Sequence, residues 1–488
     1  MKEGEVAGAY EEFQVVVVGA GPGGLATAIE LGSYGIATLV VDRRSATSRL
    51  PRATVASTGT MELLRRWGLE KAARERSLDV EWQAWECETL AAADQGRAID
   101  VGLPTREQAS LVSPSSPACL PQDDLEPLLE RHLPSFPSLR LERGVELVAL
   151  EQARDEPLLT LAGPGRLRRQ VRARFVVGAD GVRSTVRRQL GIPTEGSEGL
   201  EMRMSILFRA PLWNLAGAFR NVIYFLSGAQ EGRSLIPAGK PDRWVLAMPL
   251  DDDDGRAPTP SQARQWIRQA AGDPGLPIEL ERSLPVVFGT GLAERFRAGN
   301  AFLIGDAAHR VTPRGGTGLN TAIRDGFDLG WKLAWVLRGW GGPRLLDSYE
   351  RERRPVAEFN TERSSRSDGS ILGNTLGLNA DVGGRIAHLW VPRDGEVVST
   401  LDLLGRGLTL FVGPDWGGAV SNHGADSPPL TLRRLDAFSA RALGLTPTGA
   451  LLARPDGHPA ALWNDEHAVP ERLVRAIRSA SGRLRDAA

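Results

Sequence analysis

The sequence predicts an α/β protein in which a Rossmann-like domain is interrupted by a mixed β-sheet and followed by a small α/β domain. Residues 13–44 have the pattern of a strand, a glycine-rich turn, a helix and a second strand, which is one βαβ unit. Short apolar and aromatic segments at 202–288 favour a more antiparallel sheet. Because the α/β pattern returns after Phe302, we expect one α/β domain with a sheet inserted into it.

The composition is typical of an ordinary globular protein, and the chain of 488 residues suggests roughly three domains. A formal net charge of -1 offers no electrostatic case for a nucleic-acid partner. The two cysteines, Cys87 and Cys119, lack the spacing of a disulfide framework or a metal site. The sequence has neither a signal-peptide pattern nor an apolar run long enough for a membrane span. We therefore expect a cytoplasmic protein without a membrane partner.

The turn "GAGPGG", Gly19 to Gly24, is the first candidate binding site. Its glycines permit a tight turn and a close backbone approach, and the following helix presents free N–H groups to a pyrophosphate. Asp42 ends the next strand, 23 residues after Gly19, where it can accept a hydrogen bond from a ribose hydroxyl. The pattern predicts a dinucleotide site, and at this stage both nicotinamide and flavin dinucleotides remain possible.

Two later strand ends also carry an aspartate. Asp180 and Gly181 lie between a predicted strand and a helix, although such a pair is equally typical of an ordinary turn. Gly305 and Asp306 follow another strand, and they place a carboxylate at the carboxyl edge of a sheet, where α/β folds bind ligands. Asp306 is the stronger candidate cofactor ligand of the two aspartates.

The segment "PRGGTGLN" precedes a helix predicted from about Gly318 to Arg338. Gly315 and Gly316 lie just ahead of this helix, whose first N–H groups have no intrahelical partner. Such a helix start stabilises negative charge, and a reduced flavin is negatively charged at N1 and the C2 carbonyl. We therefore predict that this segment holds a flavin ring. No second G-x-G-x-x-G occurs, which favours a single, permanently held dinucleotide.

With these motifs in this order, the chain resembles the group A flavoprotein monooxygenases of the para-hydroxybenzoate hydroxylase fold. Within them it is most similar to the aromatic polyketide and phenol hydroxylases that carry an added C-terminal domain. The resemblance covers most of the chain and implies FAD as cofactor and NADPH or NADH as co-substrate. It also implies that the C-terminal domain is thioredoxin-like. Since that region contains no cysteine, its expected role is structural.

The resemblance implies a set of cofactor-binding residues. Asp42 is expected at the adenosine ribose, Asp306 at the ribityl and diphosphate region, and Asp180 in an indirect role linked to NAD(P)H use. Arg52 matches an arginine near the flavin, and Gln122 matches a glutamine that contacts FAD. The full expected set is Gly19, Ala20, Gly21, Gly23, Gly24, Asp42, Arg43, Arg52, Gln122, Asp180, Gly305, Asp306, Gly315, Gly318, Leu319 and Asn320.

The implied activity is insertion of one atom of O2 into an aromatic substrate, by way of a flavin C4a-(hydro)peroxide. A polycyclic phenol or a polyketide-type natural product is the expected substrate. We predict that Pro313, Gly315 and Gly316 are the catalytic surroundings, because a proline turn and bare amides pack on a flavin without an acid that hastens peroxide loss. His309 is expected to be structural.

Two other functions are compatible with the same motifs. Baeyer–Villiger oxygenation or an oxidation without oxygen insertion would use the same cofactor, and product mass and structure distinguish them. A non-catalytic FAD-binding protein would keep its flavin without oxidising NAD(P)H. A flavin halogenase is disfavoured because the sequence has no W-x-W-x-I-P stretch.

The predicted domains follow from the positions of the motifs. The FAD-binding domain comprises residues 1–80, 108–195 and 289–375, and the substrate-binding sheet domain comprises 81–107 and 196–288. A linker at 376–398 leads to a C-terminal domain at 399–488. The expected partners are an aromatic small molecule and O2, and the chain is expected to be a monomer or a homodimer. The aromatic residues expected in the substrate pocket are Trp213, Phe219, Tyr224, Phe225, Trp244 and Phe288.

Two positions depart from the family pattern. Thr312 and Pro313 stand where relatives often carry two prolines, and Gly59 stands where many carry arginine. These departures are expected to affect the position of the flavin and the affinity for the reductant.

Overall fold

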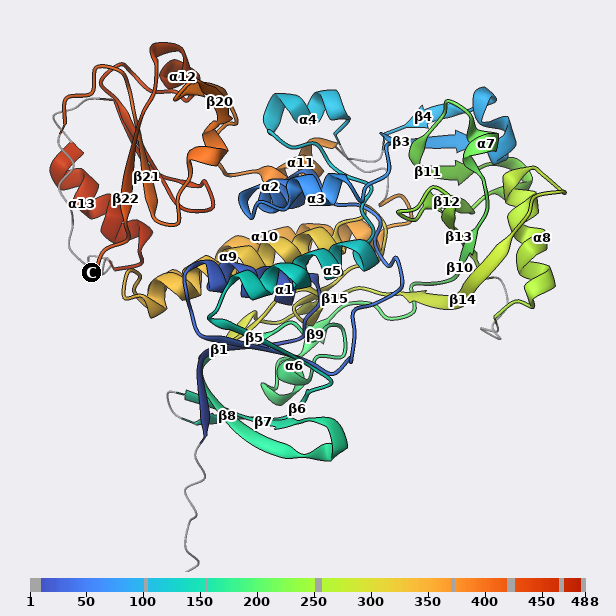
Figure 1. The fold of residues 1–488 in the computed structure, drawn as a ribbon, viewed down its shortest axis with the longest axis horizontal. Helices are drawn as coiled ribbons and strands as arrows, with labels where there is room; N and C mark the ends of the chain where they lie inside the picture. The colour runs from blue at the N-terminus through green and yellow to red at the C-terminus, as the bar shows by residue number, and fades with distance from the viewer. Residues whose placement is uncertain are drawn as a thin grey trace, which may run out of the picture.

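The computed structural model describes residues 10–100, 104–153, 156–250, 257–369, 374–418, 426–464 and 469–483. A central α/β unit carries a mixed sheet on one side and a smaller α/β unit on the other (Figure 1). This arrangement confirms the predicted fold class. Among the described residues, none of the helices combines the length and apolar character needed to cross a membrane.

The central sheet has the strand order β16-β17-β8-β1-β2-β5, and its strands from β17 to β5 run parallel. Val15 to Val18 of β1 are buried, as expected for a parallel strand that is covered on both faces. Strands β2 and β5 are added on one side of β1, and strands β8 and β17 on the other, so the strand order reverses at β1. Open α/β sheets bind ligands at such a reversal, and a crevice is therefore expected beside β1. The strands are β1 (Glu11–Val18), β2 (Thr38–Asp42), β5 (Leu139–Arg143), β8 (Arg168–Gly178), β16 (Arg297–Ala298) and β17 (Ala301–Leu303), extended by the β6 (Glu146–Ala153) and β7 (Glu156–Ala162) hairpin.

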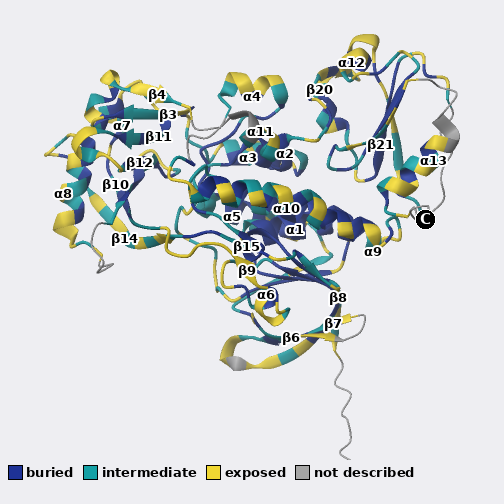
Figure 2. Cartoon of the chain, turned by 180° about the vertical axis from the view of Figure 1, so that it is seen from behind, coloured by how far each residue is buried: buried dark blue, intermediate teal, exposed yellow. Residues whose placement is uncertain are grey.

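Two buried helices, α1 (Pro22–Ser33) and α9 (Gly318–Leu337), pack together over this sheet (Figure 2). Their backbones approach closely at Gly326, where a Cβ atom would lie 2.4 Å from the carbonyl oxygen of Gly23. This contact brings the N-termini of both helices to the carboxyl ends of the strands. The other helices of the unit are α2 (Thr58–Arg66), α3 (Glu70–Arg74), α4 (Arg106–Val112), α5 (Gln122–His132), α6 (Thr185–Gln189) and α10 (Arg344–Ser365).

The second large sheet has the order β14-β10-β13-β12-β11-β3-β4 and is antiparallel except between β11 and β3. One face packs with helix α8 around a core that includes Phe208, Tyr224 and Trp244. The alternate residues face the central unit. Its elements are β3 (Glu81–Cys87), β4 (Arg97–Ile99), β10 (Glu201–Arg209), α7 (Trp213–Ala216), β11 (Asn221–Leu226), β12 (Ser234–Pro237), β13 (Arg243–Pro249), α8 (Pro260–Ala271) and β14 (Glu279–Phe288).

The smaller α/β unit contains the sheet β22-β21-β23-β24 and contacts the central helices. The carbonyl oxygen of Arg406 accepts hydrogen bonds from the hydroxyl of Tyr34, the residue that follows α1, at 2.8 Å, and from the indole of Trp335 of α9, at 3.0 Å. Its elements are β21 (Leu408–Val412), β22 (Leu430–Arg434), α12 (Ala437–Ala442), β23 (Ala450–Ala453), β24 (Pro459–Trp463) and α13 (Val469–Ala480), preceded by the hairpin β19 (Trp390–Arg393) and β20 (Glu396–Ser399). A short sheet of β9 (Thr194–Glu195), β15 (Gly291–Ala293) and β18 (His309–Arg310) lies in the central unit.

The range predicted as a linker contains β19 and most of helix α11 (Asn374–Val382). Asp381 of α11 caps α2, because its carboxylate accepts from the Ser57 hydroxyl at 2.6 Å and from the backbone N–H of Gly59 at 2.8 Å. A Cβ atom on Gly59 would lie 2.8 Å from this carboxylate. The contact leaves no room for a side chain at this position, which suits glycine.

Substitution Gly326→Val is expected to lower the free energy of unfolding by about 1–3 kcal/mol, because the added atoms push α9 away from α1. Urea unfolding of the purified protein measures the effect. Gly163→Ala is the control, since its Cβ atom would meet nothing closer than 3.9 Å, and it is expected to change stability by less than about 0.5 kcal/mol. Equal stability of both variants would contradict the close packing of the two helices.

Candidate functional site

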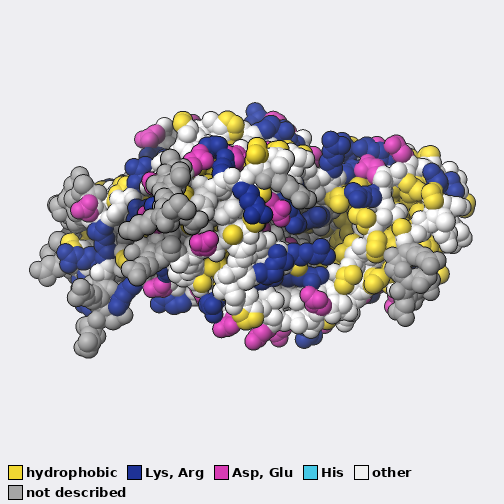
Figure 3. Space-filling model, turned by 90° about the horizontal axis from the view of Figure 1, so that it is seen from below, with side chains coloured by type: hydrophobic (Ala, Val, Ile, Leu, Met, Phe, Trp, Pro, Cys, Tyr) yellow, Lys and Arg dark blue, Asp and Glu magenta, His cyan; other side chains and the backbone are white. Residues whose placement is uncertain are grey.

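A cavity of about 1660 Å³ lies between the carboxyl edge of the central sheet and the inner face of the second sheet. In the space-filling view from below, the surface is hollowed between arginine and lysine side chains near the middle and hydrophobic side chains toward the second sheet (Figure 3). A pocket for one drug-sized ligand measures about 300–1,000 Å³. This cavity therefore has room for a large cofactor together with a second molecule.

Most residues predicted to bind the cofactor or to catalyse the reaction line this one cavity. They are Gly19, Gly21, Gly23, Gly24, Asp42, Arg43, Arg52, Gln122, Asp180, Gly305, Asp306, Pro313, Gly315, Gly316, Gly318 and Leu319. Ala20 and Asn320 are not among the lining residues. The buried Asn320 amide accepts from the Ser57 backbone at 2.9 Å and donates to the Gly316 carbonyl at 2.8 Å, so it shapes the loop that enters α9.

Two helix N-termini open onto the cavity. Helix α1 begins at Pro22 and α9 begins at Gly318, and neither first turn has a side-chain cap. Their free N–H groups and positive dipole ends therefore remain available to an anionic ligand. A Cβ atom on Gly21 would meet no protein atom within 4 Å, so a ligand can approach the backbone of the first turn closely.

Asp42 is buried at the end of β2 and is already bonded to the protein. Its carboxylate accepts from the backbone N–H of Ala20 at 2.8 Å and from the guanidinium of Arg44 at 3.1 Å, with Arg143 at 3.3 Å. Burial raises the pKa of Asp42, but the hydrogen bonds from Arg44 and Ala20 outweigh it and the net pKa is lowered. A ribose hydroxyl that binds this carboxylate must share it with Arg44.

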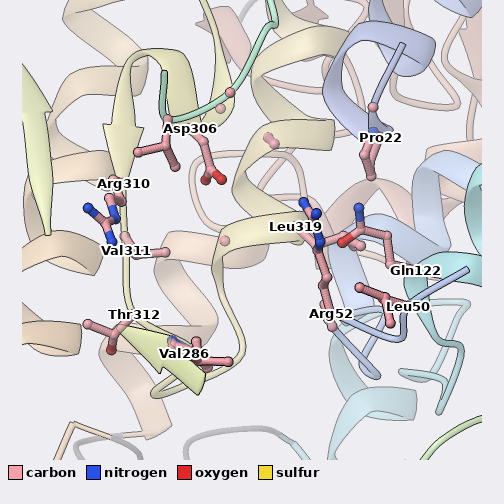
Figure 4. A pocket seen from close by; sticks show the side chains of 18 of the residues that line it. Pro22, Leu50, Arg52, Gln122, Val286, Asp306, Arg310, Val311, Thr312 and Leu319 are labelled. Carbon is pink, nitrogen blue, oxygen red and sulfur yellow. The ribbon is translucent and has the colours of Figure 1, made fainter. Parts of the chain in front are cut away.

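Asp306 and Arg52 face each other across the cavity. Figure 4 shows Asp306 and Arg310 on one side, and Arg52 and Gln122 on the other. Asp306 is exposed and lines the cavity, where desolvation raises the pKa of its carboxyl, while His309, Arg52 and Arg310 partly lower it. Within the described part of the chain, neither Asp306 nor Arg52 has a hydrogen-bonding partner for its side chain. Both groups are therefore free to bind a ligand.

Asp180 uses its carboxylate to start helix α6. It accepts from the Ser184 hydroxyl at 2.5 Å and from the backbone N–H of Thr185 at 2.6 Å. Burial raises the pKa of Asp180, and these hydrogen bonds lower it only in part. The residue lines the cavity beside the glycine-rich turn, which is consistent with an indirect role.

A buried ion-pair network fixes the turn that carries Asp306. Asp325 of α9 contacts His309 Nε2 at 2.5 Å, accepts from Arg353 Nε at 2.8 Å and accepts from the Gly305 backbone at 3.1 Å. Burial alone would raise the pKa of Asp325, but His309 and Arg353 lower it to about 2. His309 therefore acts on the structure of the turn, as expected.

The second sheet forms the other wall of the cavity and is mostly aliphatic. Alternate residues of adjacent strands point inward, among them Ser205, Leu207, Ile223, Phe225, Ile236, Val245, Ala247 and Leu284. Ser205 has no hydrogen-bonding partner for its hydroxyl among the described residues. It supplies a neutral polar group on an apolar surface, which suits a flat substrate with few polar substituents.

The predicted aromatic lining is right for Phe225 and Phe288 and wrong for the other four residues. Tyr224 and Trp244 point to the opposite face and are fully buried in the core. Trp213 packs on Trp244 with ring centroids 4.5 Å apart. The fourth, Phe219, packs on Trp85. Strand alternation explains the error for Tyr224 and Trp244, because adjacent strand residues lie on different faces. Trp213 lies in helix α7 and Phe219 follows it, so neither belongs to a strand.

Several arginines in the cavity were not singled out from the sequence, namely Arg44, Arg203, Arg282 and Arg310. Arg203 lies two residues before Ser205 on β10, so the period of the strand could have identified it. Arg44 lies two residues after Asp42, where it meets the carboxylate. Arg282 depends on the pairing of β10 with β14, which no local pattern reveals.

Comparison with known proteins agrees with this geometry. The family described as "FAD binding domain" matches residues 12–364. The chain is 32% identical to a tetracenomycin A2 monooxygenase-dioxygenase of Streptomyces glaucescens, over 97% of both proteins. It is also 32% identical to an aklavinone 12-hydroxylase of Streptomyces purpurascens, over 94% of this chain and 96% of that one. A crystal structure of aklavinone-11 hydroxylase with FAD and aklavinone superposes with a TM-score of 0.86 at 30% identity, over 98% of this chain and 100% of that one.

The cavity residues fit FAD. Two uncapped helix N-termini can meet its anionic parts, an open backbone at Gly21 admits the pyrophosphate, and the Arg52 guanidinium has no protein partner among the described side chains. The acidic groups Asp42 and Asp306 suit hydroxyl donors of a ribose or ribityl chain.

Substitution Asp325→Asn is expected to destabilise the protein by about 3–5 kcal/mol at pH 5–7, because Arg353 and His309 lose their buried partner. The folded-state pKa of about 2 lies below the ordinary value of 3.8, so the stabilisation is present above pH 3.8 and is lost as the pH falls toward 2. Urea unfolding of both proteins from pH 7 to pH 3 measures the difference. Asp347→Asn removes an exposed ion pair and serves as the control. A constant difference across this range would contradict the network.

Substitution Asp306→Asn is expected to weaken FAD binding by about tenfold or more, because hydrogen bonds to a charged group are lost. The same variant without FAD is expected to be more stable than wild type at neutral pH. Because the pKa of Asp306 is raised in the folded protein, ionisation of this carboxyl lowers the stability of wild type. The stability advantage of the variant therefore grows as the pH rises and disappears in acid. FAD titration and urea unfolding measure the two effects. Asp415→Asn, at an exposed carboxylate, controls for the change in net charge.

Proposed function

The chain belongs to the FAD-binding-domain family of flavoprotein monooxygenases, and we propose that it inserts one atom of O2 into a polycyclic phenolic or polyketide-type substrate, with NADPH or NADH as reductant. One observation carries the proposal. A single cavity joins a cofactor half, built from strand ends and helix N-termini, to an aliphatic half on the second sheet. A cofactor and a flat substrate can therefore meet without leaving the protein.

FAD supplies the redox chemistry when bound, because it accepts electrons from NAD(P)H and passes them to O2. The protein residues hold it in place. We assign the pyrophosphate to the first turn of α1, the ribityl region to Asp306, and the flavin ring to the start of α9 with Pro313, Gly315 and Gly316 beside it. These assignments use the cavity lining together with the free N–H groups.

The second sheet provides the substrate contacts in this proposal. Its apolar inner face excludes water from the reacting groups, which favours oxygen transfer over side reactions. Phe225 and Phe288 can pack against an aromatic ring system, and Ser205 can orient it through a hydroxyl or carbonyl group. Relatives named as tetracenomycin and aklavinone oxygenases support a polycyclic substrate.

The predicted domain division is also part of this proposal. Residues 81–99 and 201–288 contribute to one sheet, and the flanking segments contribute to the central sheet, which supports the discontinuous FAD-binding and substrate-binding domains. A cytoplasmic location is proposed because the reaction consumes NAD(P)H, which the cytoplasm supplies.

The purified FAD-loaded protein is expected to oxidise NAD(P)H in an O2-dependent reaction that polycyclic phenols stimulate. With ¹⁸O2, the product is expected to gain one labelled oxygen atom, which mass spectrometry detects. Product structure separates ring hydroxylation from Baeyer–Villiger insertion. Substrate-stimulated NAD(P)H oxidation without label in the product would overturn the proposal.

A pocket variant tests where the substrate binds. Ala247 faces the cavity from β13, opposite Ser205 of β10. Ala247→Phe fills this space and is expected to raise KM for the phenol by about tenfold or more, with FAD affinity unchanged. Val397→Phe, on an exposed strand of the smaller unit, is the control. An unchanged KM would place the substrate elsewhere.

A further inference from the structure

The segment from Val311 to Thr317, here called the cavity loop, has an anchor at each end. The Thr312 hydroxyl donates to the Ser364 carbonyl of α10 at 2.8 Å. The Asn320 amide holds the Gly316 carbonyl at 2.8 Å. Between these anchors, Gly315 and Gly316 have φ angles of +81° and +62°, and the loop lines the cavity there. Inside the loop the Gly316 N–H donates to the Pro313 carbonyl at 3.0 Å, and a further contact joins the middle of the loop to the second sheet.

Arg314 supplies this contact. Its guanidinium forms an ion pair with Glu201 at the start of β10. The other carboxylate oxygen of Glu201 accepts from Arg203 at 2.6 Å. The three residues, here called the arginine bridge, join the cavity loop to the strand that carries Ser205. Arg203 lines the cavity, whereas Arg314 is not among its lining residues.

The ring of Phe288, which comes from the second sheet, packs against both arginines of the bridge. The guanidinium carbons of Arg314 and Arg203 lie 5.5 Å and 6.0 Å from the ring centroid of Phe288, which also lines the cavity. Side-chain exposures of 16% for Arg314, 24% for Glu201 and 17% for Arg203 show that the charges are largely shielded from solvent. A shielded network with an aromatic neighbour is stronger than an exposed ion pair.

We propose that the arginine bridge is a positioning device that couples occupation of the substrate half to the position of the cavity loop. A substrate that packs on Phe288 or contacts Arg203 orders the carboxylate of Glu201, and Glu201 in turn orders Arg314 and its neighbours Pro313 and Gly315. The inference rests on the proposed function, since it assigns the loop to the cofactor half.

The expected consequence is control of the fate of O2. In the coupled reaction, NAD(P)H, a proton and O2 convert a substrate C–H bond to C–OH, and the second oxygen atom leaves as water. In the uncoupled reaction, the same two electrons and two protons convert O2 to hydrogen peroxide. A loop that is poorly placed beside the substrate is expected to favour the uncoupled route.

The test compares Glu201→Gln and Arg314→Ala with wild type. Hydrogen peroxide released per NAD(P)H oxidised in the presence of the phenol is expected to rise about threefold or more, the size of effect that a coupling residue produces. FAD titration and thermal unfolding of each variant give its FAD occupancy and folded fraction, so that peroxide ratios are compared at equal FAD loading. Arg314→Lys retains the charge and is expected to restore part of the coupling.

A second measurement does not depend on turnover. Hydrogen–deuterium exchange of residues 311–317 is expected to be faster in both variants than in wild type, in the FAD-free protein as well as the FAD-loaded one. The phenol is expected to protect this segment in FAD-loaded wild type and not in the variants. Arg209→Ala is the control, because Arg209 lies on the same strand and pairs with Asp242 and Glu281, away from the loop.

The outcomes separate this inference from the proposed function. The bridge has no positioning role if wild type hydroxylates its substrate and both variants match wild type in two measurements. These are the peroxide released per NAD(P)H oxidised and the hydrogen–deuterium exchange of residues 311–317. An equal rise in peroxide for Arg209→Ala would also overturn it. If wild type fails to oxygenate any phenol, the proposed function fails, whereas faster exchange of the loop in the variants still supports the mechanical link.

Discussion

The site depends on one buried carboxylate, that of Asp325. It lies on α9 and holds together His309, Arg353 and the backbone of Gly305, which come from two other segments, the turn that carries Asp306 and helix α10. Without a cation beside it, a carboxylate at this depth would be neutral. Arg353 and the bonded ring of His309 keep the pKa of Asp325 low, so the turn bearing Asp306 is fixed to the same helix whose N-terminus opens onto the cavity. The position of the acid and that of the helix dipole are therefore set together.

The close contact of α1 with α9 imposes a second constraint. Gly326 allows the two backbones to meet, and both helices then begin at the same edge of the sheet. Much of the cofactor half is therefore made of backbone N–H groups rather than side chains. Such a site can be recognised in the sequence, because a close backbone approach requires glycine. The unpaired N–H groups belong to the first turn of a helix, whose start can be predicted from the sequence.

This explains which parts could be predicted. Gly19, Gly21, Gly23, Gly24, Asp42 and the Gly305-Asp306 pair could be predicted to line the cavity because each belongs to a local strand-turn-helix pattern. The capping of α2 by Asp381 could not be found, since it joins residues 322 positions apart and involves a segment that resembles a linker. The inner face of the second sheet was assigned only in part. Its aromatic residues were recognisable, but the face that each one occupies depends on strand register.

The two halves of the cavity are therefore specified by different physics. In the proposed arrangement the cofactor half is held by backbone geometry and a buried ion pair, and the substrate half is a sheet face of mostly apolar side chains. A catalyst built this way needs a defined link between its halves. Arg314 belongs to the loop of one half, Glu201 and Arg203 belong to the strand of the other, and Phe288 touches both arginines. A single carboxylate shared by two cations satisfies this need, because moving either arginine changes the position that the other can adopt.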